Sequence, residues 1–216
     1  MKILEKILRY GLILSLLTPL VIGDSLIFPF VSTKAYFFYI LVDILLIVYL
    51  ALLSQKKLYP NKNKLFLFFV GLISLTFIFD IFGIGFKNSF WGNYERMMGI
   101  FTSIHFIIYF WILLSVFNTP KKYLKLLNIS LIVSFLVGIY GILQKLDIHF
   151  FGIVNIADHR ISATFGNPAY LAGFALLFIF LAAYLFFKNE NKYWRIFYFI
   201  TTILNLFTLY LTVTRG

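Results

Sequence analysis

Long apolar runs separated by short polar linkers are the dominant pattern along the chain. A membrane-crossing helix needs roughly 17–25 predominantly apolar residues. By that measure we predict spans at residues 7–23, 35–53, 65–83, 99–117, 127–144, 168–187 and 196–214. The pattern therefore predicts an all-α fold, a polytopic transmembrane helix bundle with about seven membrane helices in one domain over residues 1–216.

Composition supports lipid as the solvent of most of these side chains. Of the 216 residues, 62% are hydrophobic and only 12% are charged, about half the charged share of a typical soluble domain. So few charges exclude an ordinary soluble globular domain, a disordered chain and a coiled coil. The chain has no cysteine, which excludes disulfide frameworks, cysteine-ligated metals and cysteine nucleophiles.

The net charge of +11 is distributed unevenly. Thirteen of the 19 basic residues lie in the N-terminal segment and in the linkers 54–64, 118–125 and 188–195. Basic residues favour the cytoplasmic side of a membrane, so we predict a cytoplasmic N-terminus and an outer position for residue 216. The excess positive charge is then a topology signal, and we expect no nucleic-acid partner.

Two of the predicted outer loops, at 84–99 and 145–167, combine glycine, aromatic and charged residues. In the second loop Asn167 is a good helix N-cap and Pro168 a good first helical residue. Arg160 lies upstream, and Gly166 permits close approach of the backbone to a ligand. We predict an anion site at this helix N-terminus; the alternative is an interfacial arginine beside an ordinary helix start.

Three further residues are candidates for the same outer surface. Arg215 ends the last apolar run, either as a snorkelling helix-end residue or as an ionisable functional group at membrane depth. Tyr94 and Arg96 open the fourth predicted span. They are either part of an aromatic belt with a local charge pair, or they line a substrate cavity.

The remaining ionisable residues give weaker signals. His105, His149 and His159 show no ligand spacing, so we expect no metal site, and no motif indicates a cofactor. Asp43 lies in the interior of the second predicted span, whereas Asp80 lies at the outer end of the third. A proton relay is one interpretation, but we favour a protonated or paired packing residue. We expect His105 to be a hydrogen-bonded packing residue.

Three stretches carry a resemblance: RISATFGNPAYLAG at 160–173, LTVTRG at 211–216 and WGNYERMMG at 91–99. They resemble motifs of the O-antigen ligase / O-antigen polymerase superfamily of bacterial inner membranes. Members typically have R-x-x-(G/A)-T-F-G-N-P-N-x-L-A-G entering a membrane helix and a later (T/S)-R-G-A helix. Ala169 departs from this pattern, because asparagine is common after the proline.

The resemblance implies a glycosyltransferase that moves a polysaccharide from undecaprenyl diphosphate to a glycan, glycolipid or protein acceptor on the periplasmic face, without a metal or other cofactor. It implies that Arg160 and Arg215 hold the diphosphate, and that Tyr94 and Arg96 contribute to substrate binding. The family's catalytic histidine lies beyond the T-R-G motif, so we expect this chain to be an N-terminal part that is inactive alone. A multi-spanning transporter or flippase for an anionic or lipid-linked substrate is the main alternative, and a non-catalytic membrane scaffold is another.

Overall fold

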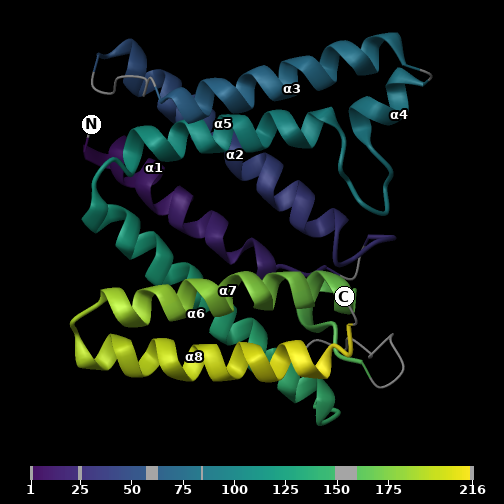
Figure 1. The fold of residues 1–216 in the computed structure, drawn as a ribbon. Helices are drawn as coiled ribbons and strands as arrows, with labels where there is room; N and C mark the ends of the chain where they lie inside the picture. The colour runs from purple at the N-terminus through teal and green to yellow at the C-terminus, as the bar shows by residue number, and fades with distance from the viewer. Residues whose placement is uncertain (1, 24–25, 57–62, 84, 149–159, 215–216) are drawn as a thin grey trace. The chain divides into compact units, whose positions relative to one another are not determined.

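The computed structural model describes residues 2–23, 26–56, 63–83, 85–148 and 160–214, and every regular element in these ranges is helical. Figure 1 shows the course of the chain. The elements are α1 (Lys2–Leu14), η1 (Ser15–Leu20), α2 (Ser32–Ser54), α3 (Lys64–Phe82), α4 (Phe86–Trp91), α5 (Ile100–Val116), α6 (Pro120–Lys145), η2 (Ala163–Phe165), α7 (Pro168–Lys188) and α8 (Lys192–Leu211).

Five of the described helices, α2, α3, α6, α7 and α8, are long and apolar enough to cross a membrane. The apolar helix α5 has 17 residues and is shorter than these five. The prediction of an all-helical membrane protein is confirmed to this extent. Seven spans and a cytoplasmic N-terminus stay predictions.

The N-terminal helix differs from the span predicted at 7–23. It begins at Lys2, ends at Leu14 and continues as the 3₁₀ helix η1. The Ser15 hydroxyl lies 2.8 Å from the carbonyl oxygen of Leu12, and Pro19 removes a backbone donor from the next turn. An α-helical ladder therefore gives way to tighter turns, although the apolar run itself continues.

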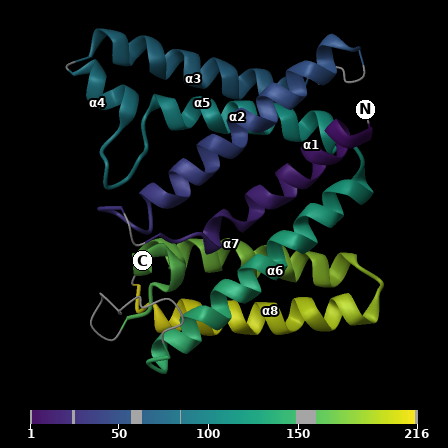
Figure 2. The same cartoon turned by 180° about the vertical axis from the view of Figure 1, so that it is seen from behind.

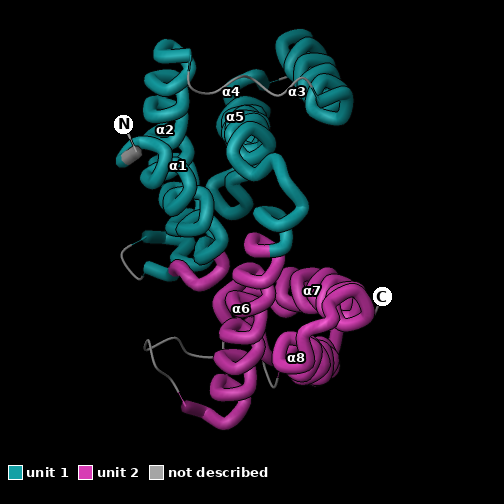
Figure 3. Tube along the Cα trace, turned by 90° about the vertical axis from the view of Figure 1, so that its left-hand side faces the viewer, with its two compact units in different colours: residues 1–18, 22–124 teal, residues 19–21, 125–216 magenta. Residues whose placement is uncertain are grey.

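The described chain divides into two compact units, which Figure 3 colours separately. Unit 1 comprises residues 1–18 and 22–124, and unit 2 comprises residues 19–21 and 125–216. In unit 1, α2 packs against α1 and α5, while α3 and α4 pack against α5, as Figure 2 shows from behind. Phe38, Tyr39 and Val42 of α2 are buried here against aromatic residues of α5.

In unit 2, α7 and α8 form a closely packed antiparallel hairpin (Figures 1 and 2). Its connection is short, and Asn191 begins α8 as an N-cap whose side chain accepts hydrogen bonds from the amides of Tyr193 and Trp194. Short connections between helices favour antiparallel neighbours. The sequence order alone therefore brings the start of α7 and the end of α8 to one end of the hairpin.

Helix α6 approaches this hairpin through a small residue and a polar contact. A Cβ atom on Gly138 would lie only 2.9 Å from Cγ of Leu204 in α8. Ser134 donates a hydrogen bond of 3.0 Å to Oδ1 of Asn205, and both residues are buried. Small residues and side-chain hydrogen bonds are the usual means of helix association in lipid. They bring the carboxyl-terminal half of α6 against α8.

Candidate functional site

Arg160 lies against the carboxyl end of α8 in unit 2. Its Nε donates a hydrogen bond of 2.8 Å to the carbonyl oxygen of Thr212, and Nη2 donates one of 3.3 Å to the Thr214 hydroxyl. The carbonyl groups at a helix C-terminus lack intrahelical partners and carry partial negative charge. Arg160 therefore caps α8, and these two bonds leave three of its five N–H groups for another acceptor.

Gln144, at the end of α6, holds the segment that follows Arg160. Its Oε1 accepts hydrogen bonds from the backbone amides of Ser162, at 3.0 Å, and Ala163, at 2.8 Å. All three residues are buried. Ala163 has a φ of 45°, a left-handed conformation that a residue with a Cβ rarely adopts without support. The side chain of Gln144 supplies that support.

The start of α7 matches the prediction from the sequence. Asn167 is the N-cap, its side chain accepts a 2.8 Å hydrogen bond from the amide of Ala169, and Pro168 is the first helical residue. Gly166 has a φ of 68°, which favours glycine at this position. The side chain of Asn167 thus binds the amide of Ala169, and Pro168 has no amide hydrogen. Of the first three helical residues, only Tyr170 has an amide left to bind an anion.

Unit 2 therefore gathers Arg160, Gly166 and the end of α8 at one end of its helices. Thr214, which contacts Arg160, directly precedes Arg215. Arg215 lies outside the described residues, as do His149 and His159. The joint role predicted for Arg160 and Arg215 stays a prediction, and so does the anion site at the start of α7.

In unit 1, the segment between α4 and α5 is closed by two glycines. A Cβ on Gly92 would lie 2.7 Å from the amide nitrogen of Gly99, so the backbone at Gly92 is in contact with the backbone at Gly99. Gly92 also has a φ of 76°. Between them, the carbonyl of Asn93 accepts hydrogen bonds from the amides of Arg96, at 3.0 Å, and Met97, at 2.7 Å. This turn fixes the positions of Tyr94 and Arg96.

Arg96 lines a cavity of about 440 Å³, which we call the Arg96 cavity. A second cation, Lys34 of α2, also lines this cavity, and the remaining surface is largely apolar. The other lining residues are Ser15, Thr18, Val31, Ala35, Phe38, Tyr39, Met97, Met98, Thr102, Phe106 and Tyr109. Two cations over an apolar surface suit a ligand that has an anionic group attached to a hydrocarbon chain.

Tyr94 lines a neighbouring cavity of about 290 Å³, which we call the Tyr94 cavity. Lys87 supplies its cation, and aromatic side chains supply much of the remaining surface. The wall formed by Tyr39 and Met97 is common to both cavities. Tyr94 and Arg96 thus line adjacent cavities of unit 1. The lysines beside them, Lys34 and Lys87, are not among the residues predicted from the sequence.

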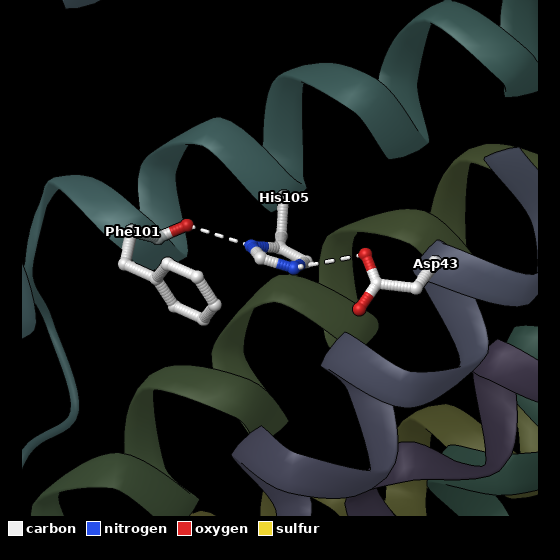
Figure 4. Close-up of polar contacts among 3 residues, drawn as sticks. All are labelled: Asp43, Phe101 and His105. Carbon is white, nitrogen blue, oxygen red and sulfur yellow. Dashed lines mark hydrogen bonds and ion pairs between the residues drawn. The ribbon is translucent and has the colours of Figure 1, made fainter.

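Asp43 and His105 form a pair between α2 and α5 (Figure 4). Oδ1 of Asp43 lies 3.4 Å from Nε2 of His105, and Nδ1 of His105 lies 2.7 Å from the carbonyl oxygen of Phe101. Asp43 is therefore paired, and His105 is a buried, hydrogen-bonded residue, as we expected of each. The sequence did not indicate that they contact each other.

No group of three histidine or acidic side chains that could hold a metal ion occurs among the described residues. The candidate groups of the described chain are accordingly cations and hydrogen-bond donors: Arg160 in unit 2, and Lys34, Lys87 and Arg96 in unit 1. No protein-family model matches the chain, and neither a curated protein nor a solved structure shows significant similarity to it.

Proposed function

We propose that the chain belongs to a membrane glycosyltransferase that moves a glycan from undecaprenyl diphosphate to a glycan, glycolipid or protein acceptor. The observation that carries the proposal is the R-x-x-A-T-F-G-N-P run at residues 160–168 together with the position of Arg160. Arg160 lies at the carboxyl end of α8, beside Thr214 of the T-R-G motif. Two motifs that are far apart in the sequence thus meet at one end of unit 2.

The chemistry of that end suits a diphosphate. An arginine presents planar, paired N–H donors that match phosphate oxygens, and Arg160 keeps three such donors after it has capped α8. Donors that stabilise the charge on a leaving diphosphate lower the barrier to glycosyl transfer. In this proposal Arg160 and Arg215 bind the diphosphate on the periplasmic side of the bacterial inner membrane.

The Arg96 cavity provides independent support from unit 1. Its apolar wall and its two cations, Lys34 and Arg96, match the two parts of a lipid-linked phosphate. The proposal assigns Tyr94 and Arg96 to substrate binding within unit 1.

The test measures glycan transfer by the complete protein in cells after the changes Arg160→Lys, Arg215→Lys and both together. Lysine keeps the charge but loses the two-pronged contact. Losing one charge-assisted contact costs about 1.5–3 kcal/mol, which is roughly a 10- to 150-fold loss of transfer. Since groups that act on one ligand are coupled, we expect the double change to deviate from the sum of the single changes.

Arg195→Lys is the matched control, because Arg195 is an exposed arginine of α8 that stacks on Phe186, with 4.9 Å from Cζ to the ring centroid. We expect it to retain transfer. All variants are compared at equal protein levels in the membrane, which separates loss of function from loss of folding. Full transfer by both single variants at positions 160 and 215 would contradict the proposal.

A transporter or flippase is a second candidate, and the Asp43–His105 pair favours it. Ionisable residues within membrane helices often belong to ion or proton pathways, and Asp43 lies midway along α2. The two functions differ in the membrane face on which the lipid-linked glycan accumulates in cells that carry the arginine variants. A transferase variant leaves the lipid-linked glycan on the periplasmic face, whereas a flippase variant leaves it on the cytoplasmic face.

A further inference from the structure

The Asp43–His105 pair places two ionisable groups inside the apolar part of unit 1. Asp43 lies midway along α2, and His105 lies in the second turn of α5. The side chain of His105 is 5% exposed, whereas that of Asp43 is 59% exposed. An ionisable group within a membrane helix is costly, and such groups persist where they are paired or functional. The proposed glycosyl transfer makes no use of this pair.

The hydrogen bonds of His105 determine where its protons lie. Nδ1 is 2.7 Å from the carbonyl oxygen of Phe101, one turn earlier in α5. A carbonyl oxygen only accepts hydrogen bonds, so Nδ1 carries a hydrogen. The other ring nitrogen, Nε2, faces Oδ1 of Asp43 at 3.4 Å. Two lone pairs facing each other repel, and a proton between them turns this contact into an attraction.

We propose that Asp43 and His105 form a proton-binding site inside the membrane, with one exchangeable proton held between Nε2 and Oδ1. Transfer of that proton from Nε2 to Oδ1 converts an imidazolium and a carboxylate into an imidazole and a carboxylic acid. The two atoms, 3.4 Å apart, approach each other for this transfer, and the net charge of the pair stays zero. Asp43 is the more exposed partner of the pair, and His105 is the buried one.

Other charged groups do not contact the pair in the described part of the chain. The helices packed on α2 and α5 carry Glu5, Lys6, Arg9 and Tyr10 on α1, Lys64 and Asp80 on α3, and Lys87 on α4. Tyr39 lies closest, but its hydroxyl is hydrogen-bonded to Thr102 and to the carbonyl of Met97. The proton is therefore shared by Asp43 and His105 alone among these groups.

The proton site is connected to a cavity through two aromatic rings. The ring of His105 lies 4.7 Å from that of Tyr39 and 4.4 Å from that of Phe101, between centroids. Both aromatic residues also line the Tyr94 cavity. An imidazolium attracts aromatic rings more strongly than a neutral imidazole does. Where the proton lies therefore affects the wall of this cavity, and a ligand that moves this wall affects the proton in return.

The test is solid-state NMR on the ¹⁵N-histidine-labelled protein in lipid nanodiscs, with the His105 signals assigned by their loss in His105→Gln. In the unmodified protein we expect a proton that correlates with Nε2 and exchanges with deuterium. Asp43→Asn keeps the size of the side chain and removes the carboxylate, so we expect this signal to be lost. Asp80→Asn makes the same change in the apolar helix α3, away from His105, and we expect it to keep the signal.

Infrared difference spectroscopy of the same samples gives a second measurement of the pair, which is needed if Asp43→Asn perturbs the fold. The carboxyl bands of Asp43 are identified from their loss in Asp43→Asn, and we expect them to shift in His105→Gln. The proposal is overturned if His105 gives the same nitrogen and proton signals with and without the Asp43 carboxylate. It is also overturned if the Asp43 bands are unchanged in His105→Gln.

Discussion

Replacing Gln144 by methionine tests whether one side chain holds the segment from Arg160 to Gly166. Methionine has a similar size but no acceptor, so the buried amides of Ser162 and Ala163 lose the oxygen that they share. Leaving a buried amide without a partner costs about 1–3 kcal/mol. For two amides this is about 2–6 kcal/mol of unfolding free energy.

The loss of the side-chain NH₂ group of Gln144 offsets part of this cost. Nε2 of Gln144 is buried and has no hydrogen-bond partner among the described residues, so methionine removes a polar group that is already unsatisfied. That removal returns about 1–3 kcal/mol. We therefore expect a net loss of about 1–3 kcal/mol, which lowers the ratio of folded to unfolded protein roughly 5- to 150-fold.

The assay compares the unfolding free energy in detergent and the hydrogen exchange of backbone amides for the unmodified protein, Gln144→Met and Gln55→Met. Gln55 is the exposed C-cap of α2, so the same chemical change there should alter neither measurement. In Gln144→Met we expect faster exchange at residues 161–166 and unchanged exchange in α3. Equal stability and equal exchange in the two variants would refute the role assigned to Gln144.

Two further predictions concern packing and orientation. Gly138→Ala brings Cβ within 2.9 Å of Leu204 and should cost about 1–3 kcal/mol of unfolding free energy, whereas Gly173→Ala meets nothing within 4 Å and should be neutral or stabilising. A reporter that is active only outside the cytoplasm should be active when fused after residue 90 and silent after residue 122; the opposite pattern would reverse the predicted topology.

Helix positions were predictable wherever the determining signal is local. The apolar runs gave α2, α3 and α7 closely, and the Asn167–Pro168 pair marked the start of α7 correctly. Helix α6 begins earlier than its apolar run, at Pro120. Its first turns are polar, and a criterion based on apolar length does not detect a helix that extends beyond its apolar part.

Contacts between distant residues were not predictable in the same way. The capping of α8 by Arg160 joins residues 52 positions apart, and Gln144 is a single polar residue at the end of an apolar run. Asp43 and His105 each stood out as an ionisable residue in an apolar helix. Their pairing depends on how α2 and α5 pack, and helical periodicity gives the face of one helix without naming its partner.

The hairpin of α7 and α8 has a consequence for the order in which unit 2 folds. Its two helices are joined by only residues 189–191, so their contacts close small loops, and local contacts form quickly. Arg160 leaves the ribosome before Thr212 does, and its hydrogen bond to that residue closes a loop of 52 positions. The Arg160 end of the unit therefore assembles last, after the hairpin beside it has formed.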